Sequence, residues 1–109
     1  MAKGLEELNE VNFEARVLEA DVPVMVEFGA TWCGPCRALE PMLAKLAAEN
    51  PGASRVVTVN VDDSPALATR YSVRGVPTVI VFAKGKEVAR QIGLAAASRF
   101  ASMMDAAKV

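Results

Sequence analysis

The chain has 109 residues, 52% of them hydrophobic, and a net charge of −1 because 12 Lys plus Arg are set against 13 Asp plus Glu. Its length predicts one domain over residues 1–109, and the scattered cations form no basic face of the kind that nucleic-acid binding requires. Because the sequence contains no histidine, catalysis by a Ser/His or Cys/His pair and Cys/His zinc sites are excluded.

The beginning of the chain predicts a protein of the cytosol. Residues 1–7 lack the apolar region of a signal peptide, and no apolar run approaches the roughly 18 residues of a membrane span. Thiols are kept reduced in the cytosol, and this chain has 2 cysteines. Glu6, Glu7 and Glu10 are expected to form a solvated acidic surface.

Three elements are predicted in the first half of the chain. Asn12 has the side chain of an N-cap for a helix over residues 13–19. The apolar run 24–28 predicts a central strand. A helical pattern follows over residues 34–49 and ends at residues 50–52, where an Asn-Pro-Gly sequence breaks it.

The second half continues the alternation of strands and helices, and its strands are apolar enough to need helices on both faces. The whole pattern predicts an α/β fold with a central mixed sheet. The predicted elements are a strand over 56–61, a short helix that begins after Ser64 and reaches residue 71, hairpin strands over 78–82 and 87–92 with a turn at 84–86, and a helix over 96–107.

The segment Trp32-Cys33-Gly34-Pro35-Cys36 joins the end of the predicted central strand to the start of the long helix. Two thiols at this spacing lie on one face of a helix, with their backbones about 5 to 6 Å apart, inside the range that a disulfide requires. The pair can therefore be oxidised and reduced with little movement of the backbone.

The same cysteine spacing also occurs in structural staples and in metal sites. As a structural staple the pair would contribute only about 2 kcal/mol, because the chain-entropy model gives little for so short a loop. As half of a zinc or iron–sulfur site it lacks further Cys or His ligands, and only a symmetric dimer sharing four thiolates would complete that site. The sequence context favours a redox-active pair.

With these residues the sequence resembles the thioredoxin family. The resemblance covers about residues 10–107 and rests on the motif at 32–36, the strand before it, the Val-Pro-Thr sequence at 76–78, and Gly93, all in family order. It implies a thioredoxin-like fold, with a central mixed β-sheet flanked by helices on both faces. It also implies a thiol–disulfide oxidoreductase that reduces disulfide bonds in protein substrates.

The two thiols are expected to take different roles in such a reaction. Cys33 stands at a helix N-terminus, where unpaired backbone N–H groups and the macrodipole favour a thiolate and lower the pKa of the thiol. Cys33 is therefore the expected nucleophile, which forms a mixed disulfide with the substrate. Cys36, one turn into the helix and more buried, is the expected resolving thiol and needs a proton acceptor before it can attack.

Glu27 is the candidate proton acceptor for Cys36. It is the only charged residue of the strand 24–28, and alternation places it with Met25 on the face opposite the other three side chains. Burial is expected to raise the pKa of Glu27 towards neutrality, which suits an acceptor. A core carboxyl kept neutral by a hydrogen bond would produce the same sequence pattern.

The sequence departs from the family pattern at three positions near this acid. The family usually has Asp, Trp and Lys where this chain has Glu27, Gly29 and Thr58. We expect Glu27 to carry its carboxyl one methylene further and Gly29 to leave an aromatic-sized vacancy. Loss of the lysine cation is expected to make the acid less readily ionised.

The resemblance also implies a substrate groove beside the two thiols. It implies a cis peptide before Pro77 and a Val76 backbone that pairs with an extended substrate segment, so that recognition tolerates many sequences. A turn proline at Pro77 and simple packing of Trp32 would fit the same residues. The implied substrate-binding residues are Trp32, Gly34, Pro35, Val76, Pro77, Gly93 and Leu94.

The resemblance further implies a monomer that binds no cofactor or metal and is reduced by a flavin- and NADPH-dependent thioredoxin reductase. An oxidant or isomerase of secreted proteins is disfavoured by the missing signal segment and by Gly34-Pro35, where more oxidising relatives usually carry His. A non-enzymatic binding module would keep its activity in Cys33→Ser. A metal-bridged dimer would contain metal and have twice the mass.

Overall fold

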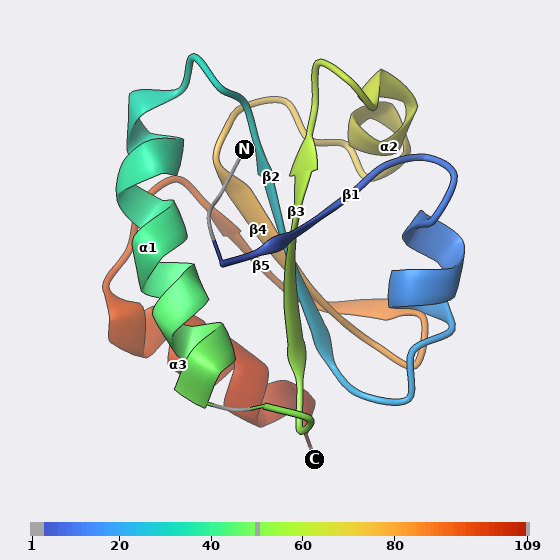
Figure 1. Ribbon diagram of the computed structural model, residues 1–109, viewed down its shortest axis with the longest axis vertical. Helices are drawn as coiled ribbons and strands as arrows, with labels where there is room; N and C mark the ends of the chain where they lie inside the picture. Colours follow the sequence, from blue (N-terminus) through green and yellow to red (C-terminus); the bar gives the residue numbers. More distant parts are fainter. Residues whose placement is uncertain (1–3, 50, 109) are drawn as a thin grey trace.

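Five strands form a mixed sheet at the centre of the molecule, in the order β1-β3-β2-β4-β5 (Figure 1). The computed structural model describes residues 4–49 and 51–108. Neighbours β1, β3 and β2 are parallel, whereas β4 is antiparallel to both β2 and β5. The strands are β1 (Glu6–Leu8), β2 (Val24–Gly29), β3 (Arg55–Asn60), β4 (Thr78–Ala83) and β5 (Lys86–Ile92).

Helices cover both faces of this sheet, so the predicted α/β fold class is confirmed (Figure 1). One face carries two long helices and the other carries two short helical segments. They are α1 (Gly34–Glu49) and α3 (Ala97–Ala107) on the first face, and η1 (Glu14–Leu18) and α2 (Pro65–Arg70) on the second.

Strand β2 is buried along its whole length, because both faces of the sheet are covered at its centre. Val26 and Phe28 pack into the core beneath η1 and α2, whereas Met25 packs beneath α1 and α3. The alternation predicted for this strand is therefore confirmed, and it places Glu27 on the same side as α1.

The N-terminal strand β1 was missed by the sequence patterns. It has only three residues, and its first two, Glu6 and Glu7, were expected to be simple solvated charges. Glu6 instead accepts hydrogen bonds from the Arg16 guanidinium at 2.6 and 3.0 Å, which links β1 to η1. A strand this short offers too few alternating positions to be recognised from its sequence.

The segment η1 is π-helical rather than α-helical, and the predicted N-cap at Asn12 is wrong. The backbone N–H of Glu19 donates to the carbonyl of Glu14, five residues earlier, at 2.9 Å. The Asn12 side chain accepts from the N–H of Asn9 at 2.8 Å, while Asn9 accepts from the N–H of Val11 at 2.9 Å. These asparagines therefore hold the loop before the helix and not its first turn.

Helix α2 begins after Ser64, as predicted, but the Ser64 side chain makes no capping hydrogen bond. Its hydroxyl is buried and has no hydrogen-bond partner among the described residues. Glu10, from the loop after β1, accepts from the N–H of Ala66 at 3.3 Å instead. This carboxylate therefore stabilises the start of α2 from a distant part of the chain.

The hairpin between β4 and β5 turns where the sequence predicted it. Lys84 and Gly85 both have positive φ angles, 52° and 79°. Two consecutive residues in this region form the tight turn that matches the twist of antiparallel strands, and glycine adopts it without steric cost.

Some predictions made from the sequence concern residues that the structure does not describe, namely Met1–Lys3 and Asn50. Among the helices that the structure describes, none has the length and hydropathy needed to cross a bilayer.

Candidate active site

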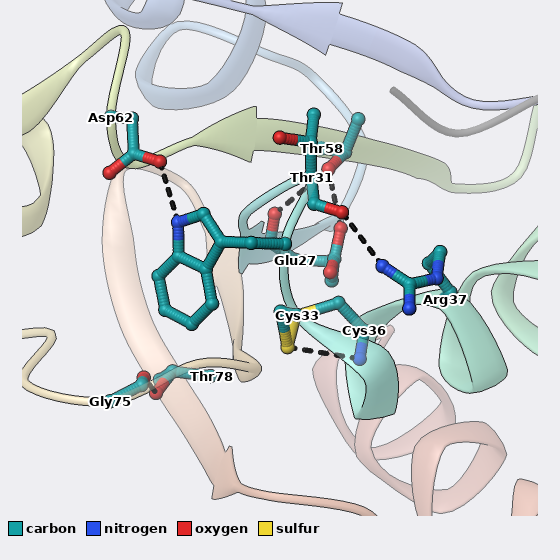
Figure 2. The surroundings of a disulfide bond; sticks show 10 residues. Glu27, Thr31, Cys33, Cys36, Arg37, Thr58, Asp62, Gly75 and Thr78 are labelled. Atoms are coloured by element: carbon teal, nitrogen blue, oxygen red, sulfur yellow. Dashed lines mark hydrogen bonds between the residues drawn. A yellow bond between two sulfur atoms is a disulfide. The ribbon is translucent and has the colours of Figure 1, made fainter.

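Cys33 and Cys36 form a disulfide at the start of α1 (Figure 2). Their Cα atoms are 5.3 Å apart, within the predicted distance. The backbone N–H of Cys36 donates to Sγ of Cys33 at 3.1 Å. This donor is free because the first N–H groups of a helix have no partner inside it, and it would equally stabilise a thiolate on Cys33 after reduction.

The two sulfur-bearing residues differ in exposure. Cys33 is 4% exposed and Cys36 is 0% exposed. Both pack against Ala30, and the side chains of Val61 and Val76 cover them from the neighbouring loops. Cys33 is therefore the residue of the pair that a large substrate can approach.

Trp32 lies on the surface, 66% exposed, and does not pack into the core. Its indole N–H donates to Oδ2 of Asp62 at 2.8 Å (Figure 2). Asp62 follows β3 and was not predicted. The structure brings it close because β3 pairs with β2, a neighbourhood that no local sequence pattern at residue 62 reveals.

The peptide bond between Val76 and Pro77 is cis, as the family resemblance implied. Val76 packs beside the disulfide, and Pro77 is buried. The carbonyl of Pro77 accepts from the N–H of Gly93 at 2.8 Å. The structure thus brings Gly93 next to Pro77, and Val76 against the cysteine pair.

Exposed apolar residues lie at the end of β5, where Ile92 pairs with Thr78 of β4. Leu94 is 53% exposed, and Ile92, which was not predicted, is 67% exposed. A hollow of ≈ 310 Å³ lies between Trp32 and the segment 73–76. Gly34 and Pro35 are exposed at the tip of the motif. Ile92 was missed because a β-branched residue at the end of a strand normally belongs to the strand's buried face.

Glu27 lies fully buried on the face of β2 that α1 covers, 0% exposed. The hydroxyl of Thr58, its neighbour in β3, donates to Oε1 of Glu27, while Oε2 has no hydrogen-bond partner among the described residues (Figure 2). Burial raises the pKa of Glu27 to about 8, although the Thr58 hydrogen bond acts in the opposite direction. At position 58, the neutral hydroxyl of Thr58 thus donates to the acid where the family pattern has a lysine.

The expected vacancy beside Gly29 is wrong. A Cβ atom placed on Gly29 would overlap Oε2 of Glu27 and lie 3.2 Å from Sγ of Cys36. The Glu27 side chain, one methylene longer than the usual Asp, therefore fills the space beside residue 29, where the family usually has a Trp side chain. The two departures from the family pattern, at 27 and 29, compensate for each other sterically.

Gly29→Ala is expected to lower the free energy of unfolding by about 1 to 3 kcal/mol, because a buried carboxyl and a sulfur must move to admit one methyl group. In a Glu27→Asp background the shorter acid should reduce this loss, which a double-mutant cycle by urea unfolding measures. Gly75→Ala is the matched control, since nothing lies within 4 Å of its added Cβ. An equal loss in both backgrounds would contradict steric compensation.

No three His, Cys, Asp or Glu side chains in the described ranges are grouped as a metal site would require.

Comparison with known proteins places this arrangement in a family. The model of the thioredoxin family matches residues 4–106. The chain belongs to the thioredoxin family. The Cys33–Cys36 disulfide is accordingly the redox-active centre of a thiol–disulfide oxidoreductase with thioredoxin-type chemistry.

Similar thioredoxins come from bacteria and from chloroplasts. The chain is 37% identical to thioredoxin C-2 of Corynebacterium nephridii, over 96% of this chain and 97% of that protein. It is 36% identical to a thioredoxin of Haemophilus influenzae, over 90% and 92% of the two chains. Against the chloroplastic M-type thioredoxin of Brassica napus the identity is 38% over 95% of this chain, which spans only 59% of that relative.

Proposed function

We propose that this chain reduces disulfide bonds in other proteins, and that Cys33 is the nucleophile and Cys36 the resolving thiol. The hydrogen bond from the N–H of Cys36 to Sγ of Cys33, at 3.1 Å, carries the proposal. It places a backbone donor and a helix N-terminus against the less buried sulfur, where both favour a thiolate.

The proposed cycle transfers two electrons to the substrate. The Cys33 thiolate attacks one sulfur of a substrate disulfide, whose second sulfur leaves as a thiolate. Cys36 then gives up its proton and attacks Sγ of Cys33, which releases the first substrate sulfur as a thiolate. The substrate ends with two thiols, and this chain ends with the Cys33–Cys36 disulfide.

Glu27 is the proposed acceptor of the Cys36 proton. Its Oε2 and the Cys36 sulfur line the same small space beside Gly29, and Oε2 is without a hydrogen-bond partner in the described part of the chain. With a pKa of about 8, roughly one-tenth of Glu27 is ionised at pH 7, and that fraction is a stronger base than an exposed glutamate.

The proposed substrate groove runs beside the disulfide. Neither the N–H nor the C=O group of Val76 makes a hydrogen bond to another described residue, so both can pair with an extended substrate segment. The apolar surface beside Val76 favours recognition of many substrate sequences over recognition of a single one. The residues proposed to contact substrate are Trp32, Gly34, Pro35, Val76, Pro77, Gly93 and Leu94.

Regeneration is proposed to come from a flavin- and NADPH-dependent thioredoxin reductase. Once oxidised, the Cys33–Cys36 disulfide must receive two electrons from outside the chain before it can act again. We place the protein in the cytoplasm, where such a donor keeps thiols reduced, and propose that it acts as a monomer through one thioredoxin domain over residues 1–109.

The proposal is tested by the turbidity of insulin in the presence of dithiothreitol. The wild-type chain is expected to accelerate precipitation well above dithiothreitol alone, and Cys33→Ser is expected to fall to that background because the nucleophile is lost. Circular dichroism serves as the control for folding. If a folded Cys33→Ser variant still accelerates the reaction, the proposed role of Cys33 is wrong.

A further inference from the structure

Thr58 lies opposite Glu27 on the neighbouring strand, on the face of the sheet that α1 covers. The register of β2 and β3 pairs the two residues directly. Met25 and Val56, each two residues earlier in these strands, pack together in the core beneath α1. Alternation therefore places Glu27 and Thr58 on that same face. Both are 0% exposed, so their polar groups must find partners inside the protein.

The Thr58 hydroxyl reaches two oxygens of Glu27, although it can donate to only one of them at a time. It donates to Oε1 of the carboxyl, and the backbone carbonyl of Glu27 lies 3.2 Å from the same hydroxyl oxygen. While Glu27 is ionised, the bond to Oε1 is the stronger one, because a charged acceptor roughly doubles the strength of a hydrogen bond. A carboxyl protonated at Oε2 still offers Oε1 as an acceptor, so the contact persists in both protonation states.

This hydrogen bond gives the two carboxyl oxygens of Glu27 different surroundings. Oε1 is held toward β3, whereas Oε2 is buried and has no hydrogen-bond partner among the described residues. Oε2 borders the space beside Gly29, where an added Cβ would lie 3.2 Å from Sγ of Cys36. In Figure 2 the carboxyl lies between Thr58 and the cysteine pair. The oxygen on the side of the resolving sulfur is therefore the one left free.

A hydroxyl orients the acid without bringing a charge to it. Burial raises the pKa of Glu27, and the Thr58 hydrogen bond offsets this only in part. The other described titratable groups that bear on Glu27 are Glu40 of α1, which also raises its pKa, and Cys36, which is uncharged in the disulfide. A cation at position 58 would hold the acid ionised at a lower pKa and make it a weaker base. Thr58 thus leaves Glu27 both oriented and basic.

We propose that Thr58 is a positioning residue for the resolving step, whose hydroxyl holds Oε1 of Glu27 so that Oε2 receives the proton of Cys36. The proposal rests on the proposed role of Glu27 as the acceptor. In this step the S–H bond of Cys36 breaks and an O–H bond forms at Oε2, while the electron pair stays on the sulfur. Cys36 then attacks Sγ of Cys33 as a thiolate. Thr58 itself neither gains nor loses a proton.

The first test measures the resolving step directly. Reduced protein is mixed in a stopped-flow instrument with dithiobis(nitrobenzoate), whose coloured thiolate is released when Cys33 attacks the reagent and again when Cys36 attacks the mixed disulfide. Only the first release depends on the reagent concentration. Thr58→Val, which removes the hydroxyl but keeps the branched shape, is expected to slow the second release about ten-fold near neutral pH and to leave the first unchanged. Thr58→Ser should restore most of the wild-type rate, because it keeps the hydroxyl.

Three results would overturn the proposal. They are a second release at the wild-type rate in Thr58→Val, an equal slowing of both releases, and a Thr58→Ser variant as slow as Thr58→Val. Circular dichroism checks that each variant is folded. Thr58→Ala, which also lacks the hydroxyl, takes the place of Thr58→Val if that variant does not fold.

The second test follows the Glu27 carboxyl itself. In the oxidised protein labelled with ¹³C at glutamate carboxyls, the NMR titration midpoint of Glu27 is expected to rise by about one pH unit in Thr58→Val, because the ionised form loses its donor. Thr58→Ser should keep the wild-type midpoint. An unchanged midpoint in Thr58→Val would show that the hydroxyl does not hold the ionised carboxyl, and would overturn the proposal.

Glu27→Gln separates this proposal from the acceptor role of Glu27. Glu49→Gln, the same change at an exposed site of α1, is its control and should leave both releases unchanged. If Glu27→Gln slows the second release but Thr58→Val does not, the acceptor role stands and positioning by Thr58 is overturned. If Glu27→Gln is as fast as wild type, both roles are lost.

The double variant shows whether Thr58 acts through the acid. In the Glu27→Gln background, Thr58→Val is expected to cause no further slowing of the second release, because no base remains to be positioned. A further loss as large as the one that Thr58→Val causes in the wild-type background would show that Thr58 acts elsewhere, and would overturn the proposal.

Discussion

Cys36→Ser is expected to stop the reaction at the mixed disulfide. Serine cannot displace a thiolate from Cys33, because its hydroxyl is not ionised near neutral pH. Cys33 keeps its place at the start of α1, and the backbone N–H of residue 36 still donates to its sulfur. The variant mixed with a disulfide-containing protein should therefore accumulate a covalent adduct close to one per chain, while turnover falls to background.

Non-reducing electrophoresis and intact mass measure that adduct, and dithiothreitol should release it. Cys33→Ser is the matched control, because it also retains one thiol. Its remaining thiol, at Cys36, is fully buried, so we expect at least about ten-fold less adduct. Equal adduct in the two variants would show that the assigned roles of nucleophile and resolving thiol are wrong.

The chemistry of the cysteine pair was predictable because it depends on local structure. A CxxC spacing at a strand-to-helix junction fixes both the Cα separation and the position of Cys33 at a helix N-terminus, and the structure has both. The strands and helices were likewise predictable from periodicity, with β1 too short to be recognised. These features need no knowledge of distant contacts.

The surroundings of the acid were predicted only in part, because they depend on packing between distant segments. The burial of Glu27 followed from alternation, but the space beside Gly29 was expected to be empty and is filled by Glu27 itself. Thr58 becomes a hydrogen-bond donor only through the register of β2 and β3.

The burial of Glu40 in α1, where it is 6% exposed, did have a usable sequence signal. It stands four residues after Cys36 and directly after Leu39, so it interrupts the apolar face of α1 with a charged residue. Helical periodicity alone places it beside the buried cysteine.

Glu27→Gln is expected to remove a strong pH dependence of stability. In the folded wild type the pKa of Glu27 is about 8, above its ordinary value of 4.5. Between these values the folded chain holds a proton that the unfolded chain has lost, so stability is fully present below about pH 4.5 and is lost as the pH rises to 8. The loss amounts to about 4 to 5 kcal/mol at most.

Urea unfolding of the oxidised protein at pH 5, 6.5, 8 and 9 measures this slope. Wild type and Glu49→Gln should lose stability together across the range, while Glu27→Gln should remain nearly level and become the most stable of the three at pH 9. Parallel curves for all three proteins would show that Glu27 ionises in the folded chain as an exposed glutamate does.

The same variant links stability to catalysis. The burial that makes ionised Glu27 costly in the fold is also what makes it a strong base toward Cys36, so removing the acid should stabilise the protein at high pH and slow its reaction. We expect Glu27→Gln to slow resolution of the mixed disulfide by about 10²-fold near pH 7, the range typical of a lost general base. A rate unchanged from pH 6 to 9 would mean that Cys36 loses its proton to water instead, even if the stability curve flattens as expected.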